Sequence, residues 1–297
     1  MLIYCLSWCN VLLKIVKCPI GKIFLFKTFQ IRTYKCNFED SSLQMSRYFI
    51  EISYLGTNYH GWQLQPNATS VQMVLEDSLK LLTGSIIRTT GAGRTDTGVH
   101  ARHFTAHFDC DHPIFGTGSH CVYKLNCILP ADISIKDLYR VKPEAHARFS
   151  ALSRTYEYRI SQHKDPFDTD LSWYFSRHLN MAAMNQAAQK LLEYSDFTSF
   201  SKLHSDVKTN LCHIMKAIWR NEAGKIIFTI KADRFLRNMV RAIVGTMIEI
   251  GQENIDIHRF TDIILARDRG LAGFSVPAHG LYLVDIAYPD LRIPSAE

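Results

Sequence analysis

The 297-residue sequence lacks the features that mark several classes of protein. Its eight cysteines include no C-x-x-C pair and no zinc-like spacing, so a reduced, intracellular setting is expected rather than a disulfide framework. The apolar stretch over residues 1–16 is interrupted by Asn10 and Lys14, and it is shorter than the ~20 residues that a membrane helix needs. The whole chain is 47% hydrophobic and 21% charged, which is typical of a soluble globular protein.

The first 44 residues differ in character from the rest of the chain. They contain four of the cysteines, no acidic residue before Glu39, and +4 of the net charge of +6. The leading positive charges of a signal peptide are missing. A lysine-rich transit peptide is one explanation, and a natural start at Met45 with upstream codons annexed by a gene model is another. We favour the second and expect the folded body to begin at Met45.

Hydrophobic periodicity predicts two α+β units in this body, each an antiparallel sheet backed by helices. We place them at residues 45–149 and 150–297. The expected strands are 47–54, 86–90, 104–108, 133–141, 155–160, 211–220, 225–231 and 281–288. The expected helices are 71–82, 120–125, 181–194, 235–250 and 257–266.

A glycine-rich stretch, GAGRTDTGVHA over residues 91–101, lies between two expected strands. A dinucleotide-binding fingerprint would need glycine where Asp96 stands, and a Walker A loop would need lysine after Gly98, where Val99 follows. A carboxylate aimed into a phosphate nest would also repel the phosphate. The glycines therefore predict a sharp loop and no phosphate cradle.

A metal site is the second chemistry that the same region suggests. Three histidines, at positions 100, 103 and 107, follow Asp96. Around them, however, Phe104, Ala106 and Phe108 alternate with polar residues, which is the pattern of a half-buried strand rather than a ligand-bearing helix. The sequence has no second ligand cluster, so we expect no metal.

The neighbours of Asp96 indicate RNA chemistry. A structural ion pair with Arg94 is the ordinary alternative for this aspartate, but arginines recur beside aromatic residues in the segments 148–149, 154–156 and 234–237. Arg241 lies one predicted helical turn beyond Arg237. Arginine pairs with phosphates and tyrosine stacks on bases. A carboxylate in this basic setting stays ionised and can act as a nucleophile or a base.

Taken together, these segments resemble the TruA family of tRNA pseudouridine synthases over essentially all of residues 46–290. The likeness rests on five motifs in the family's order: Tyr59-His-Gly-Trp-Gln63, Gly91-Ala-Gly-Arg-Thr-Asp-Thr-Gly-Val-His-Ala101, Ala145-His-Ala-Arg-Phe-Ser150 with Arg154-Thr-Tyr156, Phe235-Leu-Arg-Asn-Met-Val-Arg241, and Gly280-Leu-Tyr-Leu283. Nothing before Met45 takes part in it.

The resemblance implies roles for individual residues. Asp96 matches the catalytic nucleophile, and Arg94 matches the arginine that takes the target nucleotide out of the stack. Tyr156 matches the aromatic residue that packs on the flipped uracil and could assist proton transfer, and Arg241 matches the residue that pairs with the aspartate. The expected substrate contacts are Tyr156, Arg148, Arg237, Gly93 and His100. A purely structural role in the loop is the alternative for His100.

The resemblance also implies the activity. We expect a cytoplasmic, homodimeric enzyme with two ferredoxin-like or RRM-like subdomains that flank a central catalytic cleft. It would isomerise uridines 38, 39 and 40 in the anticodon arm of tRNA. The reaction breaks N1–C1′ and forms C5–C1′, so it needs no metal or cofactor. Addition to the base, attack at C1′ and removal of a ribose proton all remain open for Asp96. The rival hypotheses are a non-catalytic tRNA chaperone and an organellar synthase with other target uridines.

Overall fold

The computed structural model describes residues 45–112, 115, 118–202 and 209–294. The two explanations given for residues 1–44, a transit peptide and a natural start at Met45, concern a segment outside the described residues. In chain order the elements are β1 (Ser46–Tyr54), α1 (Val71–Thr83), β2 (Thr90–Gly91), β3 (His100–Cys110), α2 (Gly118–Ile128), β4 (Ile133–Val141), β5 (Ser153–Ser161), β6 (Trp173–Tyr174), α3 (Met181–Lys190), β7 (Ile214–Glu222), β8 (Lys225–Ala232), α4 (Met239–Gly251), α5 (Ile257–Ala266) and β9 (Leu281–Ala287). No helix in this part of the chain is long and apolar enough to cross a membrane.

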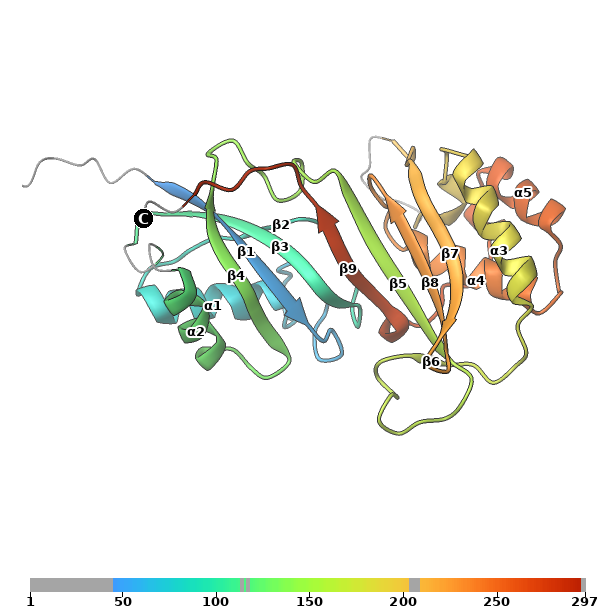
Figure 1. The fold of residues 1–297 in the computed structure, drawn as a ribbon, viewed down its shortest axis with the longest axis horizontal. Helices are drawn as coiled ribbons and strands as arrows, with labels where there is room; N and C mark the ends of the chain where they lie inside the picture. The colour runs from blue at the N-terminus through green and yellow to red at the C-terminus, as the bar shows by residue number, and fades with distance from the viewer. Residues whose placement is uncertain (1–44, 113–114, 116–117, 203–208, 295–297) are drawn as a thin grey trace, which may run out of the picture. The chain divides into compact units, whose positions relative to one another are not determined.

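All the strands belong to one mixed sheet (Figure 1). Its order is β4-β1-β3-β9-β5-β8-β7, with β2 beside β3 and β6 beside β5. The last strand, β9, runs parallel to β3 and antiparallel to β5. The α+β class is confirmed, but the expected pair of separate antiparallel sheets is wrong. Local periodicity identifies a strand without identifying its neighbours, and β9 joins the two halves from the far end of the chain.

The helices bury two groups of apolar side chains against this sheet. α1 and α2 contribute Leu75, Leu79 and Leu125 to a cluster with β1 and β3, whereas α3, α4 and α5 form the second cluster with β5, β7 and β8. In β9, Leu283 belongs to the first cluster and Leu281 to the second. Tyr156 packs against both clusters. The two clusters therefore meet at β5 and β9, where the sequence places a site residue.

Helix α1 has a capping residue at each end in addition to its apolar stripe, and this is why the sequence predicts it correctly. Ser70 caps the first turn by accepting a hydrogen bond from the Met73 amide (3.3 Å). Gly84 ends the helix in the left-handed region at φ 73°, which glycine adopts without steric cost. The prediction of a helix over 71–82 is confirmed, as are the predicted strands at β1 and β4, the β7–β8 hairpin, helix α5 and strand β9.

Two predicted elements differ from the structure. Only the last residue of the expected strand 86–90 is in β2, because the Thr89 amide and hydroxyl donate to Glu76 of α1 (2.9 and 3.1 Å) instead of pairing with a strand. The helix expected from residue 235 begins at Met239. Asn238 has φ 66°, a left-handed conformation that cannot continue a right-handed helix upstream.

Candidate active site

The glycine-rich stretch forms the loop between β2 and β3, and side chains beneath it fix its path. The Tyr54 and Thr95 hydroxyls are hydrogen-bonded (2.9 Å), and the Gly98 amide donates to the Tyr59 carbonyl (3.3 Å). The Val99 amide donates to the Asp96 carbonyl (3.1 Å) and closes a turn. Asp96 thus projects from a loop whose backbone is held on both sides of it.

The first motif, residues 59–63, packs directly against this loop. Trp62 is buried and stacks on Phe104 of β3 with ring centroids 4.1 Å apart, so it serves packing. A Cβ atom on Gly91 would lie 2.3 Å from the Trp62 indole nitrogen. A Cβ atom on Gly61, which has φ 84°, would lie 2.2 Å from the Thr95 carbonyl oxygen. Glycine is needed at both positions because the two loops approach so closely.

The Asp96 carboxylate lies between two guanidinium groups. Its Oδ1 is 3.7 Å from Arg237 Nε and its Oδ2 is 3.8 Å from Arg241 Nη1, with 28% of the side chain exposed. Both contacts are within the range of an ion pair but are too long for hydrogen bonds. The oxygens therefore sit in a positive field while remaining open to a substrate. Arg241 is fixed in turn, because its Nε donates to the Val276 carbonyl (2.7 Å).

The two arginines reach Asp96 from different structures. Arg241 is in the first turn of α4, whereas Arg237 precedes the helix. The expectation that Arg237 and Arg241 lie one turn apart in a single helix is therefore wrong. The left-handed Asn238 between them turns the chain, and its side-chain amide donates to the Ser275 hydroxyl (2.6 Å). The turn brings Arg237 to one carboxylate oxygen and Arg241 to the other.

Tyr156 lies on β5, close to the loop. Its ring meets Phe235 edge to face, with centroids 5.1 Å apart. Burial, opposed by the positive charge of Arg154 and aided by the negative charge of Asp96, raises the pKa of Tyr156 to about 12. The phenol is therefore protonated at neutral pH and can donate a hydrogen bond.

Arg154 is a residue whose part in the site the sequence did not reveal. Its Nη2 donates to the carbonyls of Ala92 (3.0 Å) and Arg148 (2.6 Å), and its Nη1 donates to that of Asp233 (2.9 Å). These carbonyls lie at the start of the Asp96 loop, within the Arg148–Phe149 pair and just before the Arg237 turn. The available signal was strand parity, since residues 154 and 156 of one strand face the same side.

The remaining predicted residues are placed as follows. Arg94 and Arg148 are exposed, and a Cβ atom on Gly93 would meet nothing within 4 Å. His100 is fully buried. Its Nδ1 accepts a hydrogen bond from the Gly56 amide (2.8 Å), and its Nε2 contacts the carbonyls of Asp170 (2.9 Å) and His279 (3.0 Å). Both ring nitrogens contact the backbone, which favours the structural alternative for His100 over a contact with the substrate.

A basic groove of about 490 Å³ lies elsewhere, lined by Arg102, Lys136, Arg159 and Lys225 among others. Arg159 is three residues from Tyr156 on β5, so the two side chains point to opposite faces of the sheet. Arg159 and Lys225 are also neutralised by Glu157 and Asp168. The groove is therefore separate from the Asp96 site. Among the described residues no group of three His, Cys, Asp or Glu is placed to hold a metal.

Comparison with known proteins gives a single family. A family model described as tRNA pseudouridine synthase matches residues 187–289. The tRNA pseudouridine synthase A of Parabacteroides distasonis is 51% identical over 250 residues, which cover 84% of this chain and 99% of that protein. The proteins of the same name from Porphyromonas gingivalis (49%; 82% of this chain, 98% of that protein) and Thermoanaerobacter pseudethanolicus (37%; 82% and 100%) are also similar. The chain therefore belongs to the tRNA pseudouridine synthase family, as the resemblance of its motifs predicted.

Proposed function

We propose that this protein isomerises uridine to pseudouridine in tRNA and that Asp96 carries the reaction. The observation that supports the proposal most directly is the Asp96 carboxylate, which is partly exposed and lies 3.7 and 3.8 Å from the side chains of Arg237 and Arg241. The names of its relatives give the substrate and the reaction.

The chemistry requires little beyond this arrangement. The N1–C1′ bond breaks, the base turns, the C5–C1′ bond forms, and the C5 proton passes to solvent while N1 gains a proton. Addition of Asp96 to the base, its attack at C1′ and its removal of a ribose proton all need an ionised oxygen that the nucleotide can reach. Arg94 would help extrude the nucleotide, which costs a few kcal/mol. The protonated Tyr156 would pack on the uracil.

The more detailed parts of the proposal rest on family likeness. The targets are uridines 38, 39 and 40 of the anticodon arm, and the enzyme is a cytoplasmic homodimer. Residues 45–149 and 150–297 are ferredoxin-like subdomains that flank the catalytic cleft. Two apolar clusters, one built mainly from residues before 150 and the other mainly from residues after it, support this division.

Release of tritium from tRNA labelled at uridine C5 tests the proposal. We expect residues 45–297 to release tritium from tRNA transcripts, and mapping of the modified positions to give the anticodon arm. Tight binding of tRNA without release from any transcript would replace the enzyme with a tRNA chaperone. Release from uridines outside the anticodon arm would instead favour a synthase with other targets, as in an organelle.

A further inference from the structure

A column of aromatic rings runs from the core of the protein to its surface. Phe49 of β1 is buried, and its ring lies 6.4 Å from that of His107 of β3, centroid to centroid. The next spacings are 4.5 Å from His107 to His146 and 4.4 Å from His146 to Phe149. Phe149 ends the column and is 77% exposed. The ring therefore has most of its surface open to solvent.

The backbone that presents Phe149 is rigidly held. His146 Nδ1 accepts hydrogen bonds from the amides of Arg148 (3.1 Å) and Phe149 (3.3 Å). His107 Nδ1 accepts one from the Ala147 amide (3.2 Å), and the Ala147 carbonyl accepts one from the Tyr288 hydroxyl (2.5 Å). An exposed aromatic side chain on a fixed turn loses little conformational entropy when it binds a partner.

This turn lies next to the proposed active site. One nitrogen of Arg154 donates both to the Arg148 carbonyl and to the Ala92 carbonyl, at the start of the Asp96 loop. The Arg148 guanidinium lies over the Phe149 ring, 5.6 Å from its centroid. The surface beside Asp96 thus combines an open aromatic ring with a positive charge, the pair of features that single-stranded RNA binds.

We propose that Phe149, flanked by Arg148, is a stacking platform for an unpaired base of the RNA substrate, next to the nucleotide that enters the Asp96 site. The inference rests on the proposed function for the identity of the ligand. The base extends the column of rings by one member, and Arg148 contacts its phosphate or its face. The platform holds a neighbouring nucleotide while the target nucleotide leaves the stack.

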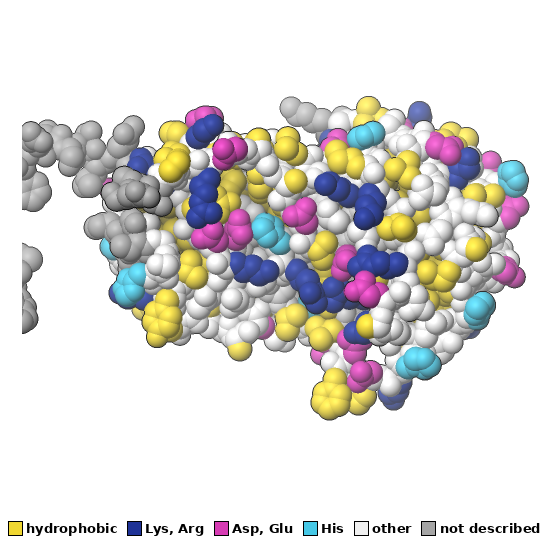
Figure 2. All heavy atoms as spheres, viewed as in Figure 1, with side chains coloured by type: hydrophobic (Ala, Val, Ile, Leu, Met, Phe, Trp, Pro, Cys, Tyr) yellow, Lys and Arg dark blue, Asp and Glu magenta, His cyan; other side chains and the backbone are white. Residues whose placement is uncertain are grey.

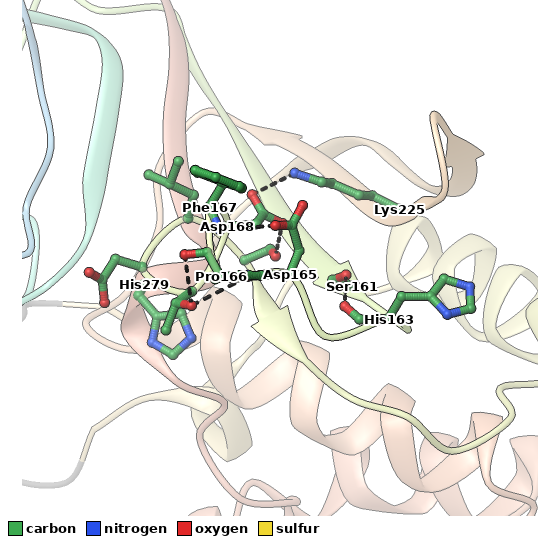
Figure 3. Close-up of polar contacts among 12 residues, drawn as sticks. Ser161, His163, Asp165, Pro166, Phe167, Asp168, Lys225 and His279 are labelled. Carbon is green, nitrogen blue, oxygen red and sulfur yellow. Dashed lines mark hydrogen bonds and ion pairs between the residues drawn. The ribbon is translucent and has the colours of Figure 1, made fainter.

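A second exposed phenylalanine provides a matched control. Phe167 is 92% exposed on the loop between β5 and β6, and Figure 3 shows the polar contacts that hold this loop. The Phe167 amide donates to Asp165 (2.9 Å), and Asp168 accepts from Lys225 (2.6 Å). Phe167 is therefore also a fixed, exposed ring, but Asp165 and Asp168 replace the arginine beside it.

The test compares Phe149→Leu, Phe149→Trp and Phe167→Leu. Each is titrated against tRNA transcripts that carry 2-aminopurine at one unpaired position of the anticodon arm, and both the Kd and the quenching of fluorescence are recorded. We expect Phe149→Leu to raise the Kd by about 5- to 150-fold and to abolish quenching at one position. Phe149→Trp should keep both, and Phe167→Leu should match the wild type.

Two results would overturn the platform. One is a Phe149→Leu variant that binds and quenches like the wild type. The other is an equal loss of affinity in Phe149→Leu and Phe167→Leu, which would indicate a general effect of removing exposed rings. Because the readout is binding, it does not depend on turnover: a wild type that binds and quenches without forming pseudouridine would refute the proposed function while leaving the platform in place.

Discussion

At the scale of the residue, the guanidinium of Arg154 connects three parts of the site. It donates to backbone carbonyls in the Asp96 loop, in the Arg148 turn and just before the Arg237 turn. Hydrogen bonds from a charged donor are each worth about 1.5–3 kcal/mol. Arg154 is thus a positioning residue, because its contacts are to the segments that carry the site side chains.

Substitution of Arg154 should destabilise the protein and slow its reaction together. We expect Arg154→Ala to lower the free energy of unfolding by about 2–3 kcal/mol and to reduce kcat. Arg154→Lys should restore little, since one ammonium cannot reproduce the planar fork. Urea unfolding and initial rates measure the two effects. The exposed Arg177 is the control, and an Arg154→Ala variant as stable as Arg177→Ala would contradict this role.

The site residues that could be predicted are those that a short motif contains. Asp96 and Arg94 lie in one stretch of sequence, so their neighbourhood is fixed by the chain itself. The contacts of Arg154 could not be predicted, because two of its three partners, Ala92 and Asp233, come from distant segments. The backbone contacts of His100 could not be predicted for the same reason, since the carbonyls beside it belong to Asp170 and His279, far along the chain.

At the scale of the element, the loop that carries Asp96 depends on close packing against the first motif. Gly91 has no room for a side chain, since a Cβ atom would lie 2.3 Å from Trp62 and 2.9 Å from Phe104. Gly93, two residues later, faces open space. The two glycines therefore serve different purposes in one loop.

Alanine at each of these glycines separates the two purposes. Gly91→Ala should lower the free energy of unfolding by about 1–3 kcal/mol through overpacking, as measured in urea. Gly93→Ala should unfold like the wild type. Because we expect Gly93 to contact the substrate, Gly93→Ala should nevertheless lower kcat/KM. Equal stability of the two variants would show that the loop does not rest on Trp62 as described.

The stability of the protein should depend on pH through His107, whose ring holds the 145–150 turn. Burial and the positive charges of His146 and Arg47 lower the pKa of His107 to about 4, although the negative charge of Asp109 opposes the shift. The folded protein keeps His107 neutral, whereas the unfolded chain takes up a proton below about pH 6.5. Stability should therefore fall between pH 6.5 and pH 4, by up to about 3 kcal/mol from this residue.

His107→Asn tests this dependence, because an amide oxygen can accept the Ala147 bond without titrating. The variant should lose less stability than the wild type between pH 6.5 and pH 4 in thermal or urea unfolding. Substitution of the exposed His178 by asparagine is the control and should leave the slope unchanged. Identical slopes for His107→Asn and the wild type would contradict the assignment.

The elements also show where prediction from sequence fails. α1 could be predicted because Ser70 and Gly84 mark its ends, and the β7–β8 hairpin because Gly224 marks its turn. The strand expected over 86–90 failed because the side chain of Glu76 takes the hydrogen bonds of Thr89. Helix α4 starts late because Asn238 turns the chain at φ 66°. In each case the deciding interaction is not part of the periodic pattern.

At the scale of the whole molecule, the net positive charge is small, and its position on the protein matters more than its size. The chain carries a net charge of +6, and Figure 2 shows Lys and Arg side chains over the middle of the sheet on the face in view, with Asp and Glu side chains among them. The Arg237 and Arg241 side chains add positive charge at Asp96. Binding of RNA should therefore depend on a few positions rather than on the net charge.

Arg237 is suited to test this, since 56% of its side chain is exposed. Arg237→Ala should weaken binding of tRNA and reduce the slope of log K against log salt by about 1, because one phosphate contact is lost. Filter binding at several salt concentrations measures the slope. Lys80→Ala removes one exposed charge from α1 and should leave it unchanged. A normal slope in Arg237→Ala would remove this arginine from the RNA path.

The most direct test of the account is the rate of pseudouridine formation by Asp96→Asn at saturating tRNA, with the Kd measured on the same preparation. We predict no detectable turnover and a Kd within about tenfold of the wild type, or roughly 1.4 kcal/mol, because phosphate contacts supply most of the affinity. Turnover near the wild-type rate would show that the carboxylate is not catalytic. A collapse of binding would show that Asp96 mainly holds the loop and its arginines together.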